Sequence, residues 1–163
     1  MDERKKILVL GIGNLILKDE GIGIHVIERL KNLPLPPDVE VIDGGVLSYK
    51  LMYIIEGRKK VIVINTMKAD GPPGTIYRFT DADIEKIRGD KKLTIQEFEF
   101  LDELGMSKFI KKNPDEIVFI GIEPEDTGEK GLMLESGLSP TLEKKIPEII
   151  DMVMREIKTD NNG

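Results

Sequence analysis

ILVLGIGNLILKDEGIG, residues 7–23, is the stretch that decides the fold class of this sequence. It begins within Lys6–Ile12, a continuous β-prone apolar run of the kind expected for a strand buried on both faces of a parallel sheet. A glycine-rich turn signal follows this run. Beyond the turn, Ile22, Val26 and Leu30 recur every four residues and predict a helix with one apolar face. A buried strand, a turn and an amphipathic helix are typical of the opening of an α/β domain.

The rest of the chain repeats this alternation of apolar runs and helical patterns. Strands are predicted at Val39–Ile42, Lys60–Asn65 and Glu116–Ile122, with a short edge strand at Thr75–Phe79. Helices are predicted at 47–55 and 95–109. This order predicts a three-layer α/β/α fold with a mostly parallel twisted sheet and one antiparallel edge strand. Right-handed crossovers then place the loops that follow the parallel strands at one edge of the sheet, where we expect the functional residues.

The last predicted helix has a recognisable start. Ser139 suits the N-cap, and Pro140 suits the first helical position. The buried stripe of this helix is predicted at Leu142, Ile146, Ile150 and Val153. Because no linker divides the chain, residues 1–158 are expected to form a single domain, followed by a frayed tail at 159–163.

Composition excludes several classes of function. The 163 residues are 40% hydrophobic and 33% charged, as in a soluble globular protein, and their formal net charge is −6. Without a basic stripe, binding of nucleic acid is not expected. The absence of cysteine excludes disulfides, thiolate metal sites and cysteine nucleophiles. The apolar runs are too short to cross a bilayer, and the charged N-terminus lacks a signal-peptide core. A cytoplasmic protein with no membrane role is therefore predicted.

The first loop carries two acidic residues at the start of the predicted helix. Its glycines do not match the dinucleotide fingerprint G-x-G-x-x-G, because the third glycine would fall at Ile16. Asp19 is expected to complement the positive end of the helix dipole. Glu20 can do the same, and a carboxylate at the carboxyl edge of a sheet can also bind a metal or polarise water. Glu20 is therefore the first candidate for a catalytic residue.

Further polar candidates follow the second and third strands. Asp43 ends the second strand, and Gly44 and Gly45 allow the close approach of another backbone. Either Asp43 takes part in binding a substrate or it caps the next helix in an ordinary turn, and the sequence favours neither. Asn65 ends the third strand and Gln96 opens the helix at 95–109. Both are neutral amides that can hydrogen-bond a substrate but are poor metal ligands.

His25 is the only histidine in the chain. It falls on the polar side of the first helix and off the face that carries Glu20. It is therefore expected to be a solvated surface residue rather than a ligand or a base. With no cysteine and one histidine in this place, Ser–His and Cys–His nucleophilic systems are excluded.

Several motifs together resemble those of the hydrogenase maturation endopeptidases. They are, in chain order, ILVLGIGNLILKDEGIG, VIDGG, VIVIN followed by PPGTIYRF, EFEFLDEL, VFIGIEPE and GLSPTLEKKI. The resemblance covers nearly the whole chain. It implies a peptidase that removes a short C-terminal extension from the precursor of a nickel–iron hydrogenase large subunit. It also implies that the peptidase acts after nickel has been loaded and recognises its substrate through that nickel.

The resemblance further implies a trio of metal-contacting residues. The family has a carboxylate after the first loop, an aspartate at the end of the third strand and a histidine at the start of the later helix. By position these correspond to Glu20, Asn65 and Gln96. Replacing Asp by Asn and His by Gln removes one negative charge and the best nitrogen donor, so nickel should be retained only weakly by this chain alone.

Three hypotheses for function follow from these residues. The first is an active maturation peptidase in which Glu20 is the principal contact to the nickel of the precursor. The second is a non-catalytic relative that binds a hydrogenase precursor or another maturation factor without cleaving it. The third is a hydrolase that uses Glu20 and Asp43 with another metal ion. Whether Asp70, in the loop after the third strand, replaces the missing carboxylate stays open.

Overall fold

The structure, a computed structural model, describes residues 4–45, 50–80, 82–83, 114–127 and 137–161. Its strands are β1 (Ile7–Ile12), β2 (Val39–Gly45), β3 (Lys60–Thr66), β4 (Ile76–Thr80) and β5 (Glu116–Ile122). Its helices are the 3₁₀ turn η1 (Lys18–Gly21), α1 (Ile22–Leu30), α2 (Lys50–Ile55), α5 (Pro140–Glu143) and α6 (Ile146–Asn161). The predicted helix at 95–109, with Gln96, lies outside the described residues.

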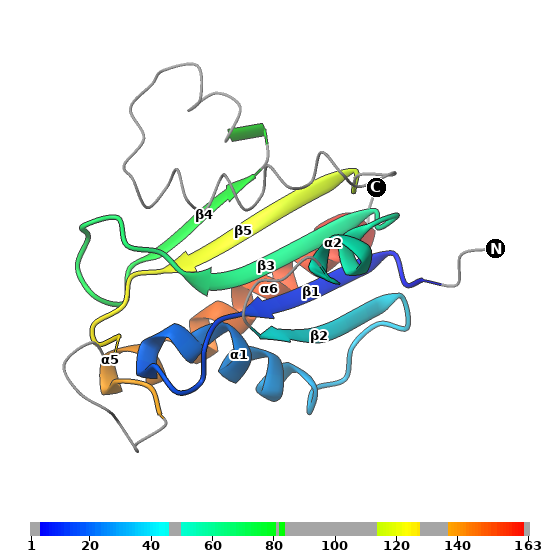
Figure 1. The fold of residues 1–163 in the computed structure, drawn as a ribbon. Helices are drawn as coiled ribbons and strands as arrows, with labels where there is room; N and C mark the ends of the chain where they lie inside the picture. Colours follow the sequence, from blue (N-terminus) through cyan, green and yellow to red (C-terminus); the bar gives the residue numbers. More distant parts are fainter. Residues whose placement is uncertain (1–3, 46–49, 81, 84–113, 128–136, 162–163) are drawn as a thin grey trace.

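The strands form one sheet in the order β2-β1-β3-β5-β4. The pairs β1–β2, β1–β3 and β3–β5 are parallel, whereas β4 runs antiparallel to β5. The prediction of a mostly parallel sheet with one antiparallel edge strand is confirmed. In Figure 1 the arrowheads of the four parallel strands point toward the same side of the molecule. The loops that follow those strands therefore share one edge, as the right-handed crossover rule predicts.

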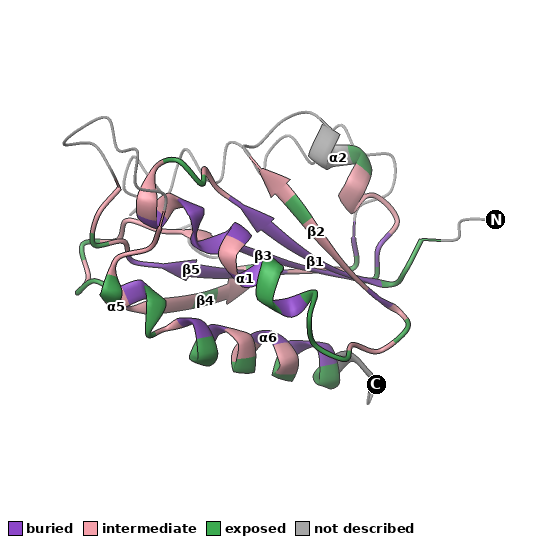
Figure 2. Ribbon diagram, turned by 90° about the horizontal axis from the view of Figure 1, so that it is seen from below, coloured by how far each residue is buried: buried purple, intermediate pink, exposed green. Residues whose placement is uncertain are grey.

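Helices cover both faces of this sheet. Successive strand residues point to opposite faces, so Ile7 and Val9 belong to one apolar cluster while Leu8 and Leu10 belong to another. The first cluster includes the buried faces of α1 and α6, and the second includes Ile54 and Ile55 of α2. Figure 2 shows the buried strands and the outward, exposed face of α6. Burial of each of these Ile or Leu side chains stabilises the fold by about 1.5–3 kcal/mol. Helices on both faces of the sheet confirm the three-layer prediction.

The last helix differs from the prediction in being broken. Helix α5 ends at Glu143, and α6 begins at Ile146. Pro147 explains the break, because its ring lacks an N–H and would clash with the carbonyl of Glu143 in a continuous helix. Ile149 is buried, whereas Ile150, which was predicted for the buried stripe, is only half-buried and packs against the same cluster.

Helix α6 continues to Asn161 and so includes the first three residues of the predicted tail at 159–163. The hydroxyl of Thr159 donates a hydrogen bond of 2.8 Å to the carbonyl of Arg155.

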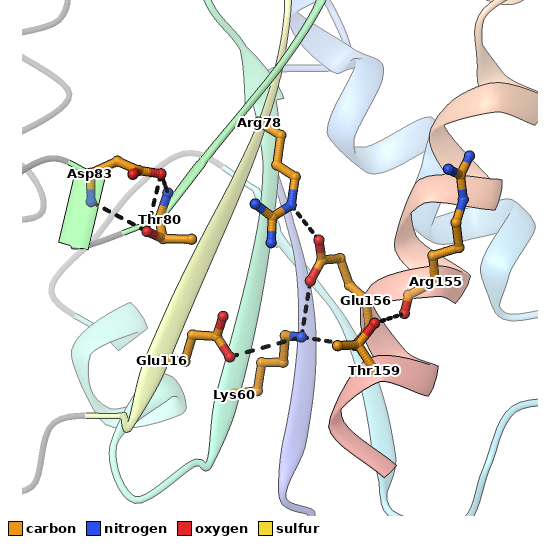
Figure 3. A network of polar contacts seen from close by, with 8 residues as sticks. All are labelled: Lys60, Arg78, Thr80, Asp83, Glu116, Arg155, Glu156 and Thr159. Carbon is orange, nitrogen blue, oxygen red and sulfur yellow. Dashed lines mark hydrogen bonds and ion pairs between the residues drawn. The ribbon is translucent and has the colours of Figure 1, made fainter. Parts of the chain in front are cut away.

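A buried lysine joins the sheet to α6 at the edge opposite the candidate loops. The side chain of Lys60, on β3, is 2% exposed, and its Nζ lies 2.9 Å from a carboxylate oxygen of Glu156 and 2.8 Å from the Glu156 carbonyl. A second carboxylate, on Glu116 of β5, lies 3.9 Å away. Arg78 of β4 pairs with the other oxygen of Glu156 (Figure 3). Because a buried charge is tolerated only when it is paired, this network fixes α6 across three strands.

The same network sets the ionisation of Glu156. Burial alone would raise the pKa of this carboxyl, but hydrogen bonds from Arg78 and Lys60 outweigh burial and lower the pKa below its ordinary value. A carboxyl with a lowered pKa in the folded state stabilises the fold above its ordinary pKa. That contribution is lost as the pH falls through the folded-state pKa.

We predict that Glu156→Gln lowers the free energy of unfolding at pH 7 by about 2 kcal/mol, the usual value for a hydrogen bond to a charged group. The difference from the wild type should shrink at a second, acidic pH below the folded-state pKa of Glu156, where the wild type also lacks the charge. Urea unfolding at the two pH values measures this. Glu148→Gln, on the exposed side of α6, is the matched control and should change stability by less than about 0.5 kcal/mol. A loss of the same size at both pH values would contradict the prediction.

Candidate functional site

The start of α1 sits directly on the ends of two strands. A Cβ atom at Gly23 would lie 2.4 Å from the carbonyl oxygen of Ile64 and 2.6 Å from that of Ile12, so no side chain fits there. Gly11 is equally close to α1, since its Cβ would lie 2.3 Å from the Gly23 oxygen. The two Gly-Ile-Gly segments of the first motif, 11–13 and 21–23, therefore pack on each other. This contact holds the loop between them over the carboxyl edge of the sheet.

Asp19 is a structural residue that ties this loop to a distant part of the chain. It is fully buried. One carboxylate oxygen accepts hydrogen bonds from the backbone N–H groups of Glu125 and Asp126, at 2.9 and 2.8 Å. Ser139 donates its N–H to the other oxygen and its hydroxyl to the first, at 2.7 and 2.8 Å. The expected interaction of Asp19 with the dipole of α1 stays a prediction, and the structure adds that its carboxylate binds the loop after β5 and the start of α5.

Ser139 occupies the predicted N-cap position of α5 but makes no side-chain cap hydrogen bond. Its hydroxyl binds Asp19 instead. The N-terminus of α5 is thus fixed to the first loop, and the structure brings together two motifs from opposite ends of the chain.

Glu20 is the residue that this arrangement leaves available for chemistry. It is half-buried, and its carboxylate has no hydrogen-bond or ion-pair partner among the described residues. Its backbone is held on both sides, since its N–H donates to Leu17 at 3.1 Å and its carbonyl accepts from Asn14 at 3.1 Å. Gly13 packs against that carbonyl with φ 152, where a Cβ would lie 1.9 Å from the oxygen. An unpaired carboxylate on a rigid backbone can contact a cation without first losing another partner.

The segment Asp43–Gly45 lies within β2, so the prediction that this strand ends at Ile42 in a turn is wrong. Gly11 pairs with Asp43 and Ile12 with Gly45, which leaves Gly44 as the extra residue of a bulge. The Asp43 carboxylate accepts from the Gly45 N–H at 2.9 Å, within its own strand. Pairing with β1 explains the difference, because the Gly45 carbonyl accepts from Gly13 at 2.9 Å.

Asn65 lies at the end of β3, opposite Gly121 of β5. It is half-buried, and its Oδ1 accepts a hydrogen bond of 2.8 Å from the N–H of Thr66. The turn η1, which carries Glu20, lies against β3. The structure thus brings Glu20 and Asn65 to the same edge. Within the described ranges, no group of three acidic or histidine side chains is placed to hold a metal ion.

Glu123 is a buried acidic residue to which the sequence reasoning gave no role. It follows β5, is 5% exposed, and accepts hydrogen bonds of 2.8 Å from the N–H groups of Ala69 and Gly71. These two residues flank Asp70, whose φ of 60 is in the left-handed region and whose side chain is exposed. The sequence signal that could have identified Glu123 is an acidic residue directly after a buried strand. Glu123 therefore fixes the loop after β3. Burial of Tyr77, together with the nearby negative charge of Glu123, raises the pKa of the Tyr77 hydroxyl.

His25 differs from the solvated residue that was expected. It is half-buried, and its Nε2 is shielded from solvent with no hydrogen-bond partner in the described part of the chain.

No helix in the described segments is long and apolar enough to span a bilayer.

Comparison with known proteins gives a consistent picture. Residues 24–156 match the family described as HycI, hydrogenase maturation protease. The chain is 28% identical to the hydrogenase 2 maturation protease of Escherichia coli, over 94% of this chain and 91% of that protein. It is also 28% identical to the hydrogenase expression/formation protein HupD of Thiocapsa roseopersicina, over 91% of this chain and only 66% of that longer protein. The solved structure of the maturating endopeptidase HybD of E. coli has a TM-score of 0.77 at 27% identity, covering 95% of this chain and 93% of HybD.

We predict that Asp19→Asn lowers the free energy of unfolding by about 3 kcal/mol, because the new amide NH₂ faces N–H and O–H donors and leaves them unpaired. Urea unfolding at neutral pH measures the loss. Asp43→Asn is the matched control, since Asp43 is exposed and makes one hydrogen bond within its own strand. It should change stability by less than about 0.5 kcal/mol. Equal effects of the two substitutions would show that the buried contacts of Asp19 do not stabilise the fold.

Proposed function

Because the chain belongs to the hydrogenase maturation protease family, we propose that it removes a C-terminal extension from the nickel-loaded precursor of a hydrogenase large subunit. Glu20 is the principal contact to the nickel that the precursor carries. The observation that carries this assignment is the half-buried carboxylate of Glu20, which has no partner among the described residues and lies on a fixed turn at the carboxyl edge of the sheet.

The charges of the site fit a metal that arrives with the substrate. Divalent nickel prefers imidazole and anionic oxygen ligands. Glu20 supplies one negative charge, whereas Asn65 and Gln96 supply neutral amide oxygens at the other two family positions. Such a set holds free nickel weakly, but a precursor that already binds the ion needs only one or two further ligands. The Oδ1 of Asn65 accepts from the Thr66 N–H and, among the described residues, has no second hydrogen-bond donor.

The bulge at the end of β2 is the proposed contact for the precursor backbone. Gly45 has φ 57, and no described atom lies within 4 Å of where its Cβ would be. Gly44 is the unpaired residue of the bulge, and Asp43 is exposed beside it. This combination of space free of described atoms, a bulged glycine and one exposed carboxylate suits the binding of an extended peptide.

Asn65 also supports a second candidate function, binding of a hydrogenase precursor without cleavage. An amide cannot accept a proton near neutral pH, so Asn65 cannot serve as a general base. Asp70, in the loop after β3, is exposed, and the N–H groups of the residues on either side of it donate to Glu123. On this alternative the scaffold and Glu20 keep their recognition role while catalysis is lost.

The first experiment is intact-mass analysis of a nickel-loaded large-subunit precursor from the same organism after incubation with the protein. Loss of a discrete C-terminal peptide is the expected result. Glu20→Gln, which removes the charge and keeps the shape, should reduce the rate of this loss at least about 100-fold, as for other groups that act in the reaction. Glu28→Gln, on the exposed side of α1, should leave the rate unchanged. An unchanged precursor mass together with a stable complex on gel filtration would favour the binding-only alternative.

A second experiment separates the two candidates at the ligand positions. If the wild type does not cleave, the double variant Asn65→Asp with Gln96→His should gain cleavage or bind nickel more tightly. The gain in nickel affinity should be at least about tenfold, since even outer-shell partners of metal sites are worth roughly 10–100-fold. Isothermal titration with nickel alone measures this gain. If neither property changes, the assignment of Asn65 and Gln96 to the ligand positions is wrong.

A further inference from the structure

The loop that carries Glu20 also exposes two adjacent apolar side chains. Leu15 is 40% exposed and Ile16 is 67% exposed. Other large exposed apolar residues in the described ranges, Leu33 and Tyr53, occur singly, as is normal on protein surfaces. Neither Leu15 nor Ile16 belongs to the apolar clusters on the two faces of the sheet. The fold therefore gains little from their apolar character.

The backbone at this tip is held in place. The Asn14 side chain accepts a hydrogen bond from the N–H of Ile16 at 3.1 Å, and the Asn14 carbonyl accepts from Leu17 at 3.1 Å. Gly21 packs on the other side, where its Cβ would lie 3.2 Å from the Cα of Leu15. A partner that covers the tip would thus lose little entropy in ordering it, and burial of the two side chains would contribute most of its transfer free energy.

The tip and Glu20 belong to one hydrogen-bonded turn. The Glu20 N–H donates to the carbonyl of Leu17, and the Glu20 carbonyl accepts from the N–H of Asn14. Glu20 and the two exposed apolar residues therefore lie on one short turn, and a partner whose metal binds Glu20 can reach Leu15 and Ile16. On the proposed function the partner of Glu20 is the nickel-loaded precursor. Because Leu15 and Ile16 lie on the same turn as Glu20, the precursor is also the expected partner of these two side chains.

We propose that Leu15 and Ile16 form an apolar docking tip for the hydrogenase large-subunit precursor. The tip packs against an apolar segment of the precursor while Glu20 contacts its nickel. This inference rests on the proposed function, because it takes the same precursor as its partner. It adds residues that contribute affinity by apolar contact and take no part in the reaction itself.

Ile16→Ser and the double variant Leu15→Ser with Ile16→Ser test the tip. With the nickel-loaded precursor as substrate, KM should rise about tenfold for each apolar side chain removed, with kcat within about twofold of the wild type. If the wild type binds without cleaving, the dissociation constant replaces KM. Leu33→Ser is the control matched in exposure, at 39%, and should leave KM unchanged. Unfolding midpoints should stay at the wild-type value for Ile16→Ser, because this side chain is the most exposed of the three.

The outcomes separate the two proposals. If the wild type neither binds nor cleaves the precursor, the proposed function and the docking tip both fail. If the wild type acts on the precursor and Ile16→Ser behaves like Leu33→Ser, the docking tip alone is overturned. A change in oligomeric mass on gel filtration with an unchanged KM would also overturn it, because the tip would then join two copies of this chain.

Discussion

The close contact between Gly23 and the ends of β1 and β3 is the constraint on which the rest of the structure depends. A side chain at Gly23 would collide with the carbonyls of Ile12 and Ile64, and α1 would have to move away from both strands. The loop 14–20 is anchored at both of its ends by this contact. The same loop carries Asp19, whose hydrogen bonds to Ser139 hold the start of α5, so this contact is linked through the loop to the position of α5.

The adjacent acidic residues Asp19 and Glu20 have different roles in this loop. Asp19 is fully buried and uses its carboxylate to accept four hydrogen bonds, because a buried charge without such partners would destabilise the fold by several kcal/mol. Glu20 is half-buried, and water or a ligand can solvate its charge. The structural contacts of Asp19 therefore allow Glu20 to remain unpaired within the described residues. A fixed carboxylate with free lone pairs is what a metal-bearing substrate requires.

Patterns local in sequence predicted the fold well. The apolar runs located β1, β3 and β5, and the alternation of strands and helices gave the layers and the antiparallel edge strand. Pairing across the chain decided what the sequence reasoning missed. Asp43–Gly45 reads as a turn, but β1 extends β2 through it, and the partners of Asp19 lie more than 100 residues away. For the site, local spacing located Glu20, whereas the roles of Asn65 and Gln96 rest on family resemblance.

A weak ligand set at this edge has a physical consequence for the proposed reaction. Imidazole and a second carboxylate would raise the affinity of the peptidase for nickel itself and would compete with the precursor for the ion. On the proposed function, Glu20 with neutral amides would bind nickel only while the precursor supplies the remaining ligands. Affinity must then come from contacts away from the metal, and the exposed Leu15 and Ile16 lie on the turn that holds Glu20. If Asn65 stands at a ligand position as proposed, its neutral amide would make apolar recognition more important, whether or not the peptide bond is cleaved.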